Sequence, residues 1–336
     1  MYIVEDIQSR DTSLSLYRYL CQHTVGIEET VRTRRMLNTI RDNLYHSKEF
    51  YQITSGSDGE GLEMKMSDID IMFVIKDVNE DEDINSPHVN LAETCVAMET
   101  EDTKLRFTRM RLLHCNNNIS WEMSTKVGID LYLSSQLCKS MVIVCRADVV
   151  HGPCLSDKDG HFDFAFTLHS RRWITTASQW VPIYNYSWPN SSNVKSQIID
   201  HGVLFVPIGS KESKNEHIEW RISFSVCEKL LIYSFTHTQL PCYALMKILI
   251  KDVVNRDIRC KDLICSCYIK NIIFCVSEEI PLSRYRPEIS IPLSRDILED
   301  SFIVLNMDYA FITSFLKSIC LKIKEKNKND KSYWHI

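Results

Sequence analysis

The 336-residue sequence contains no apolar run close to the ~20 residues that a membrane-spanning helix requires, and no internal repeat is visible. The first residues, MYIVEDIQSRDTS, carry acids early and no long apolar stretch, so we expect no secretory signal. An excess of one charge is also lacking. The net charge of −5 gives no argument for a nucleic-acid partner, although it leaves room for a local basic surface. We therefore expect a soluble, cytoplasmic protein with no membrane partner.

The thirteen cysteines lack any short repeated spacing. Their densest group, Cys260, Cys265 and Cys267, does not match the common spacings of zinc ligands. Scattered cysteines in a cytosolic protein are mostly reduced and buried. We expect free thiols here.

What the chain does contain is enough apolar sequence, 44% of residues, for a large core in one two-lobed unit or in two domains. Strands mixed with an early helix precede a run of helices that starts near residue 226. This order is typical of an α+β lobe followed by a helical lobe.

The periodicity predicts the individual elements. A helix is expected over 11–49, with a break near Gly26 and apolar positions Leu37, Ile40 and Leu44 at helical spacing. Strands are expected at 69–76, 104–112, 127–134, 140–149, 161–168, 202–207 and 219–225. Further helices are expected at 226–235, 241–255, 263–276 and 309–324. The acidic run 77–87 is expected to be a loop, and 171–200 a crossing segment.

The stretch SGSDGEGLEMKMSDIDIMFVIKDV, residues 55–78, places two carboxylates in an apolar strand. On a strand Asp68 and Asp70 share one face with Met72, and the residues between them face the core. Adjacent carboxylates repel, and a divalent cation such as Mg²⁺ removes that repulsion. Just upstream, Gly56-Ser57 and Gly59 to Gly61 form a turn whose N–H groups can converge on an anion. The alternative is a hairpin loop followed by a strand with solvated acids.

A third carboxylate has two candidates, Asp130 in VGIDLYLSS and Asp163 in GHFDFAFTL. Periodicity cannot choose between them, because both lie on amphipathic strands. Ala165 and Thr167, which share a face with Asp163, are small enough to leave room for a metal and a triphosphate. Tyr132 would crowd the space beside Asp130, so we favour Asp163.

Gly-Ser, ten residues and then Asp-x-Asp in an apolar strand resemble the polymerase-β-like nucleotidyltransferases. More specifically, six blocks occur in an order that resembles cyclic GMP–AMP synthase (cGAS) and its cGAS-like receptor and male-abnormal (Mab) relatives. The blocks are DIDIMF (68–73), FDFAFTLHS (162–170), HGVLFVPIG (201–209), EWRISFSVCEKLL (219–231), CYALMKILIK (242–251) and CSCYIKNIIFCVSEE (265–279). GSDGEGL and HGPCLSDKDGHFDFAF look most like the invertebrate branch.

The resemblance implies a bilobed nucleotidyltransferase fold with a mixed β-sheet core, a long N-terminal spine helix and a C-terminal helical lobe. The core lobe would span 1–172 and the mainly helical lobe 173–336, whose two strands would pack back on the core sheet. The implied activity is to join two nucleoside triphosphates, ATP and GTP, into a cyclic dinucleotide when a nucleic acid binds. Two Mg²⁺ or Mn²⁺ ions would assist, and the protein would serve as an innate immune sensor.

The resemblance also assigns roles to individual residues. Gly56 and Ser57 would cradle phosphate, and Asp68, Asp70 and Asp163 would hold the metals. Nucleotide contacts would come from Arg221, Ser223, Lys247 and Tyr268. Cys267 departs from the serine that cGAS has beside this tyrosine, so a thiol stands there in place of a hydroxyl.

A larger departure concerns zinc. cGAS carries one His and three Cys between the helices that here contain Glu228 and Lys247, and this chain has no such cluster. We expect no structural zinc, with His237 and Cys242 in structural roles. Because the zinc cluster of cGAS is missing here, double-stranded RNA is favoured over DNA as the activator.

Arg34, Arg41 and Lys48 recur every seven residues and would form one stripe on the first long helix. Such stripes bind backbone phosphates, although a solvated face explains the pattern equally well on sequence alone. The resemblance favours the nucleic-acid surface. Two other functions stay open: a catalytically silent Mab-branch scaffold, and a nucleotidyltransferase with another acceptor such as an RNA end.

Overall fold

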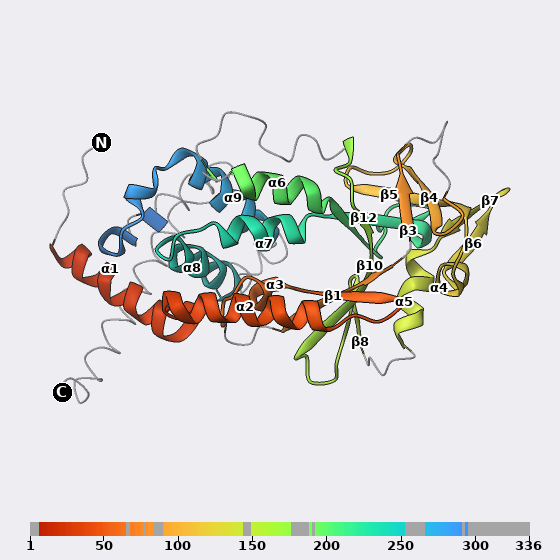
Figure 1. Ribbon diagram of the computed structural model, residues 1–336. Coiled ribbons are helices and arrows are strands. Elements are labelled where there is room, and N and C mark those ends of the chain that lie inside the picture. Colours follow the sequence, from red (N-terminus) through yellow and green to blue (C-terminus); the bar gives the residue numbers. More distant parts are fainter. Residues whose placement is uncertain are drawn as a thin grey trace.

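The computed structural model describes residues 7–64, 68–76, 78–82, 90–143, 149–175, 188–189, 192–252, 266–290 and 293–294. The protein is a mixed α/β structure in which a curled mixed sheet occupies one end and most helices gather at the other (Figure 1). Within these residues, no helix combines the length and the apolar character needed to cross a bilayer.

The main path of the sheet runs in the order β1-β2-β10-β11-β12-β5-β4-β3. The strands are β1 Phe50–Ser55, β2 Ile69–Ile75, β3 Val78–Asp81, β4 Thr94–Glu99, β5 Phe107–His114, β10 Phe162–Ser170, β11 Val203–Val206 and β12 Glu219–Ser223. Along this path, β2 pairs with β10 and β3 with β4 in parallel. Two hairpins extend the sheet: β6 Ser124–Val127 with β7 Asp130–Leu133, and β8 Val149–His151 with β9 Cys154–Ser156.

The predicted helix over 11–49 is confirmed as two helices with a break. α1 spans Ile7–Leu20, a π-helical turn spans Cys21–Val25, and α2 spans Glu28–Leu44. The break falls at the expected Gly26, whose φ of +90° favours glycine. α2 ends at Leu44, five residues before the expected end near residue 49.

The helices that follow cover the sheet and build the second end of the molecule. They are α3 Gly56–Gly59, α4 Asn118–Glu122, α5 Ser135–Ile143, α6 Ser192–His201, α7 Ser225–Tyr233, α8 Gln239–Asp252 and α9 Ser266–Glu279. α7, α8 and α9 confirm three of the four later helices predicted. The fourth, at 309–324, lies outside the described residues.

Two predicted elements are wrong. Residues 140–143 belong to helix α5 instead of a strand; Ser134 caps this helix by accepting a hydrogen bond from the Leu137 N–H, and Cys138 is buried against the sheet. The expected loop at 77–87 contains strand β3, which pairs with β4 and buries Glu80. In the first case, packing of α5 against the sheet outweighed a local apolar pattern that is typical of a strand. In the second case, pairing with β4 outweighed the local negative charge that is typical of a loop.

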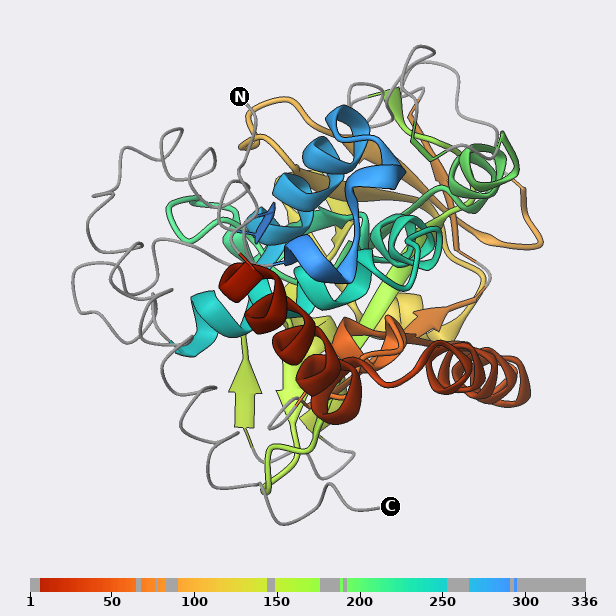
Figure 2. The ribbon, with the colours of Figure 1, turned by 90° about the vertical axis from the view of Figure 1, so that its left-hand side faces the viewer.

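The buried apolar side chains form two large hydrophobic cores and a smaller cluster of Ile53, Val74, Leu204 and Val226. One large core is built from buried side chains of α1, α2 and α6 to α9, and Figure 2 shows α1 lying against this group. The other lies on the sheet around Trp220, whose indole N–H donates to the Leu133 carbonyl at 2.8 Å. Trp173 and Phe224 pack against both cores.

α2 turns its polar face inward. Asn38 donates to the Asp58 carbonyl at 2.7 Å, and Asp42 accepts from the Thr54 N–H at 2.9 Å. Arg35 donates to the backbone carbonyls of Glu60, Ile232 and Tyr233. The opposite face carries the exposed side chains Met36, Leu37, Ile40 and Leu44. The helix is therefore held by hydrogen bonds to backbone groups of α3, β1 and α7 rather than by an apolar stripe.

We expect Arg35→Leu to destabilise the protein by about 2–4 kcal/mol, because it removes three part-buried hydrogen bonds that one guanidinium makes to backbone carbonyls. Arg32→Leu is the matched control on the same helix, since the Arg32 side chain is 77% exposed and, among the described residues, pairs with Glu28 of the same helix. Its expected effect is below about 0.5 kcal/mol. Urea unfolding measures both, and equal losses would contradict the polar anchoring of α2.

Candidate active site

Three carboxylates meet at the start of the parallel pair β2–β10. Asp70 lies in β2 and Asp163 opposite it in β10, and Asp68 precedes β2 by one residue. One carboxylate oxygen from each lies within 4.8 Å of the others. Asp130 lies elsewhere, at the start of β7, with its side chain 44% exposed and 3.9 Å from Arg111. The structure thus groups Asp163, and not Asp130, with the pair in the DID sequence.

Crowding changes the acidity of these groups. Burial, followed by the charges of Asp68 and Asp163, raises the pKa of Asp70 to about 6. Burial and Asp163 also raise the pKa of Asp68. Each shift expresses the cost of keeping negative charge here without a cation. The three oxygen ligands form a donor set that suits a hard divalent cation such as Mg²⁺ or Mn²⁺.

The Gly56-Ser57 turn lies directly against this cluster. Gly56 adopts φ +63°, and a Cβ on it would sit 1.7 Å from Asp70 Oδ2. A side chain at residue 56 would therefore displace the Asp70 carboxylate. The turn begins the short helix α3, and β1 places Ser55 opposite Asp70.

Lys247 reaches the turn from α8. Its ammonium donates to the Ser57 hydroxyl at 2.7 Å and lies 3.4 Å from Glu60. Burial lowers the pKa of Lys247, while Glu60 acts to raise it. This hydrogen bond therefore joins the Gly56-Ser57 turn to a helix that lies 190 residues later in the sequence.

Sequence reasoning missed the charged residues behind Lys247. Glu60 is 1% exposed; it accepts from the Tyr243 hydroxyl at 3.0 Å and pairs with Lys270 of α9 at 2.8 Å. Lys270 also donates to Glu228 at 2.8 Å. Burial acts to raise the pKa of Glu60, but Lys270 and Lys247 outweigh it and lower that pKa. The only sequence signal was a glutamate beside the glycine turn, and nothing in it indicates burial.

The other predicted nucleotide contacts lie on β12 and α9. Arg221 and Ser223 belong to β12. Burial raises the pKa of the nearby Cys154; the charges of Asp163 and Asp70 act in the same direction, and the charge of Arg221 acts to lower this pKa. Tyr268 and Cys267 are in α9, and their side chains lie outside the described part of the structure.

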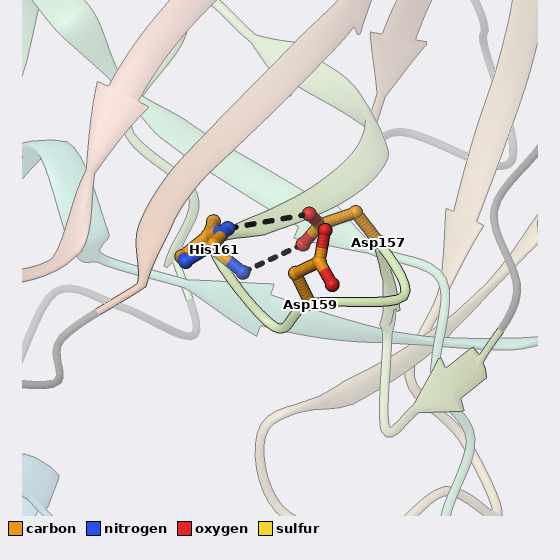
Figure 3. A group of neighbouring side chains, drawn as sticks. All are labelled: Asp157, Asp159 and His161. Atoms are coloured by element: carbon orange, nitrogen blue, oxygen red, sulfur yellow. Dashed lines mark hydrogen bonds and ion pairs between the residues drawn. The ribbon is translucent and has the colours of Figure 1, made fainter.

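A second acidic group, Asp157, Asp159 and His161, lies in the loop between β9 and β10 (Figure 3). Asp157 accepts from the backbone N–H groups of His161 and Phe162 at 2.6 and 2.8 Å, and the Phe162 hydrogen bond is the main cause that lowers its pKa. These hydrogen bonds close the loop and bring Asp157 close to His161, so the proximity of the two side chains does not require a bound metal.

The three residues of the predicted basic stripe are not equivalent. Arg34 pairs with Glu63 and donates to the Val25 carbonyl at 3.3 Å. Arg41 lies 3.7 Å from Asp58 and stays half-exposed. Lys48 lies beyond the end of α2, so the stripe does not continue along one helix. Nucleic-acid binding by these residues stays a prediction.

His237 and Cys242 make the kind of contacts that were expected of structural residues. The two ring nitrogens of His237 lie 3.0 Å from the Tyr17 hydroxyl and 3.0 Å from the Gly26 carbonyl oxygen. Cys242 is buried in the helical core as a free thiol.

Comparison with known proteins adds no assignment: no protein-family model matches the chain, and no curated protein matches it significantly.

Gly56→Ala tests the contact between the turn and the carboxylates. Its matched control is Gly128→Ala, which has a similar φ of +66° but no atom within 4 Å of the added Cβ. Backbone strain of about 1 kcal/mol is common to both. We expect only Gly56→Ala to abolish thermal stabilisation by Mg²⁺, as measured by calorimetry. Equal Mg²⁺ responses would show that Asp70 tolerates a side chain at residue 56.

Asp70→Asn tests whether burial and repulsion of the three carboxylates reduce the stability of the metal-free protein. Because the folded-state pKa of Asp70, about 6, exceeds the ordinary value of 3.8, its ionisation reduces stability as pH rises from about 4 to 6. We expect the metal-free variant to be more stable than wild type by about 1–3 kcal/mol at pH 7.5 and equal to it near pH 4. Urea unfolding across pH measures this difference. A variant that is less stable than wild type at pH 7.5 would contradict it.

Proposed function

We propose that the protein is a nucleotidyltransferase that joins two nucleoside triphosphates into a cyclic dinucleotide. The observation that carries this proposal is the grouping of Asp68, Asp70 and Asp163 beside a glycine-serine turn that Lys247 contacts. Metal-binding carboxylates next to a cationic phosphate cradle are what phosphoryl transfer requires, because the reaction depends on positioning and charge neutralisation. The resemblance of the sequence blocks to the cGAS-like family supports the same conclusion.

The proposed fold is the bilobed nucleotidyltransferase fold. The separation of one core around the sheet from another among the helices supports it. Residues of both groups converge at the site: the carboxylates come from β2, the residue before it and β10, and the lysines from α8 and α9. Substrate would bind between them.

In the proposed mechanism, Asp68, Asp70 and Asp163 would hold two Mg²⁺ or Mn²⁺ ions. When bound, such ions lower the pKa of the attacking hydroxyl and neutralise charge on the leaving pyrophosphate. The Gly56-Ser57 turn and Lys247 orient the triphosphate. Asp163 helps to remove the proton from the attacking sugar hydroxyl.

Three further residues would recognise the nucleobases. Arg221 and Ser223 would contact nucleobases from β12, and Tyr268 would stack on one from α9. The substrates that the resemblance favours are ATP and GTP. A nucleic acid, with double-stranded RNA preferred over DNA, would activate the protein in a cytoplasmic antiviral response. This regulatory part rests on the resemblance.

A catalytically silent scaffold is the weaker alternative. Burial and mutual repulsion of the three carboxylates reduce the stability of the metal-free protein, as the raised pKa values of Asp68 and Asp70 indicate. A scaffold would gain stability by replacing any one of them. A nucleotidyltransferase with a different acceptor would use the same carboxylates, so only its products distinguish it.

The test is product analysis with purified protein, labelled ATP and GTP, and Mg²⁺ or Mn²⁺, with and without double-stranded RNA or DNA. We expect a cyclic dinucleotide from the wild type and a loss of at least about 100-fold in Asp163→Asn, which removes a charged ligand at nearly constant volume. Asp130→Asn, the control, should retain most activity. Linear products on an RNA end would favour the alternative acceptor, and no product under any condition would favour the scaffold.

A further inference from the structure

β9 is a three-residue strand that extends the sheet only beside the carboxylate cluster. It pairs with β10 through two residue pairs, Asp163 with Ser156 and Phe164 with Leu155. Farther along, at Leu168 to Ser170, β10 pairs with β11 instead. The β8–β9 hairpin therefore places one specific residue, Ser156, against Asp163.

Asp163 has a different neighbour on each side. Across the parallel pair it faces Asp70, and across the antiparallel pair it faces Ser156. Directly opposed residues of an antiparallel pair have their side chains on the same face, about 5 Å apart. The Ser156 hydroxyl accordingly donates a hydrogen bond to Asp163 Oδ1.

We propose that Ser156 is a positioning residue for the metal site. Its hydroxyl binds Oδ1 of Asp163 and thereby fixes the orientation of that carboxylate beside Asp68 and Asp70. Without this donor, repulsion from the two neighbouring carboxylates would turn the Asp163 side chain away from the cluster. Partners behind a metal ligand set its orientation, and their loss typically reduces metal affinity 10- to 100-fold. This inference rests on the metal site of the proposed function.

The loop after β9 supports the same arrangement. Asp157 follows Ser156 directly, and its carboxylate accepts from the backbone N–H groups of His161 and Phe162. Its own N–H donates to the Phe162 carbonyl at 3.1 Å. These bonds close the loop between β9 and β10 and fix the register that brings Ser156 opposite Asp163. Asp157 of the loop in Figure 3 thus acts on the site through the backbone.

The experiment measures Mn²⁺ binding to the full-length protein by isothermal titration calorimetry at pH 7.5 without nucleotides. Ser156→Ala should weaken Mn²⁺ binding about 10-fold or more, and Ser156→Thr, which keeps the hydroxyl, should stay close to wild type. Ser156→Cys keeps a side chain of similar size but offers only a weak hydrogen-bond donor, so it should also weaken Mn²⁺ binding. If Ser156→Ala does not fold, the cysteine variant decides the test. Asp159→Asn, in the neighbouring exposed loop, should bind as wild type does.

Four outcomes are distinct. Wild-type Mn²⁺ affinity in a folded Ser156→Ala or Ser156→Cys variant overturns the role of Ser156 and leaves the proposed function standing. Weakened affinity with an unchanged melting temperature, rescued by Ser156→Thr, supports it. Absence of Mn²⁺ binding by the wild type overturns both. The expected Mn²⁺ pattern in a protein that forms no nucleotide product supports the role of Ser156 and overturns the proposed function alone.

Discussion

The crowding of three carboxylates at one end of the β2–β10 pair is the constraint that explains most of the surrounding structure. Asp70 and Asp163 face each other across parallel strands, and Asp68 is close to both. The raised pKa values of Asp68 and Asp70, caused first by burial and then by neighbouring carboxylates, show that the fold holds the cluster together against repulsion. Glycine at residue 56 is a direct consequence, because any larger residue would occupy the space of the Asp70 carboxylate.

A second group of charged side chains lies on the helical side of this negative cluster. Lys247 and Lys270 lie near enough to Asp70 to lower its pKa, and both pair with Glu60. With Glu228 the group has two positive and two negative charges, so burial leaves no net charge uncompensated. Segments far apart in the sequence are tied together at this point, which keeps the lysines beside the Gly-Ser turn.

α2 completes the support of the turn in an unusual way. Asn38 and Arg35 bind backbone carbonyls of the α3 segment, while Leu37 and Ile40 on the other side remain exposed. An amphipathic helix normally buries its apolar stripe. Here backbone groups of a tight turn required partners, and polar side chains supplied them. The position of the turn is therefore sensitive to the position of α2.

Sequence alone determined the local features: the helix break at Gly26, strand β2 with Asp70 in it and Asp68 directly before it, and helices α7 to α9. Each follows from short-range periodicity or from the backbone freedom of glycine. The tertiary structure decided what depends on distant partners. It grouped Asp163 instead of Asp130 with the pair through the register of β2 and β10. It made a strand of Val78–Asp81 and a helix of residues 140–143, and it buried Glu60 among lysines. Periodicity contains no information about which distant segment supplies a countercharge or a hydrogen-bond donor, and for that reason Lys270 and Ser156 became visible only in the folded chain.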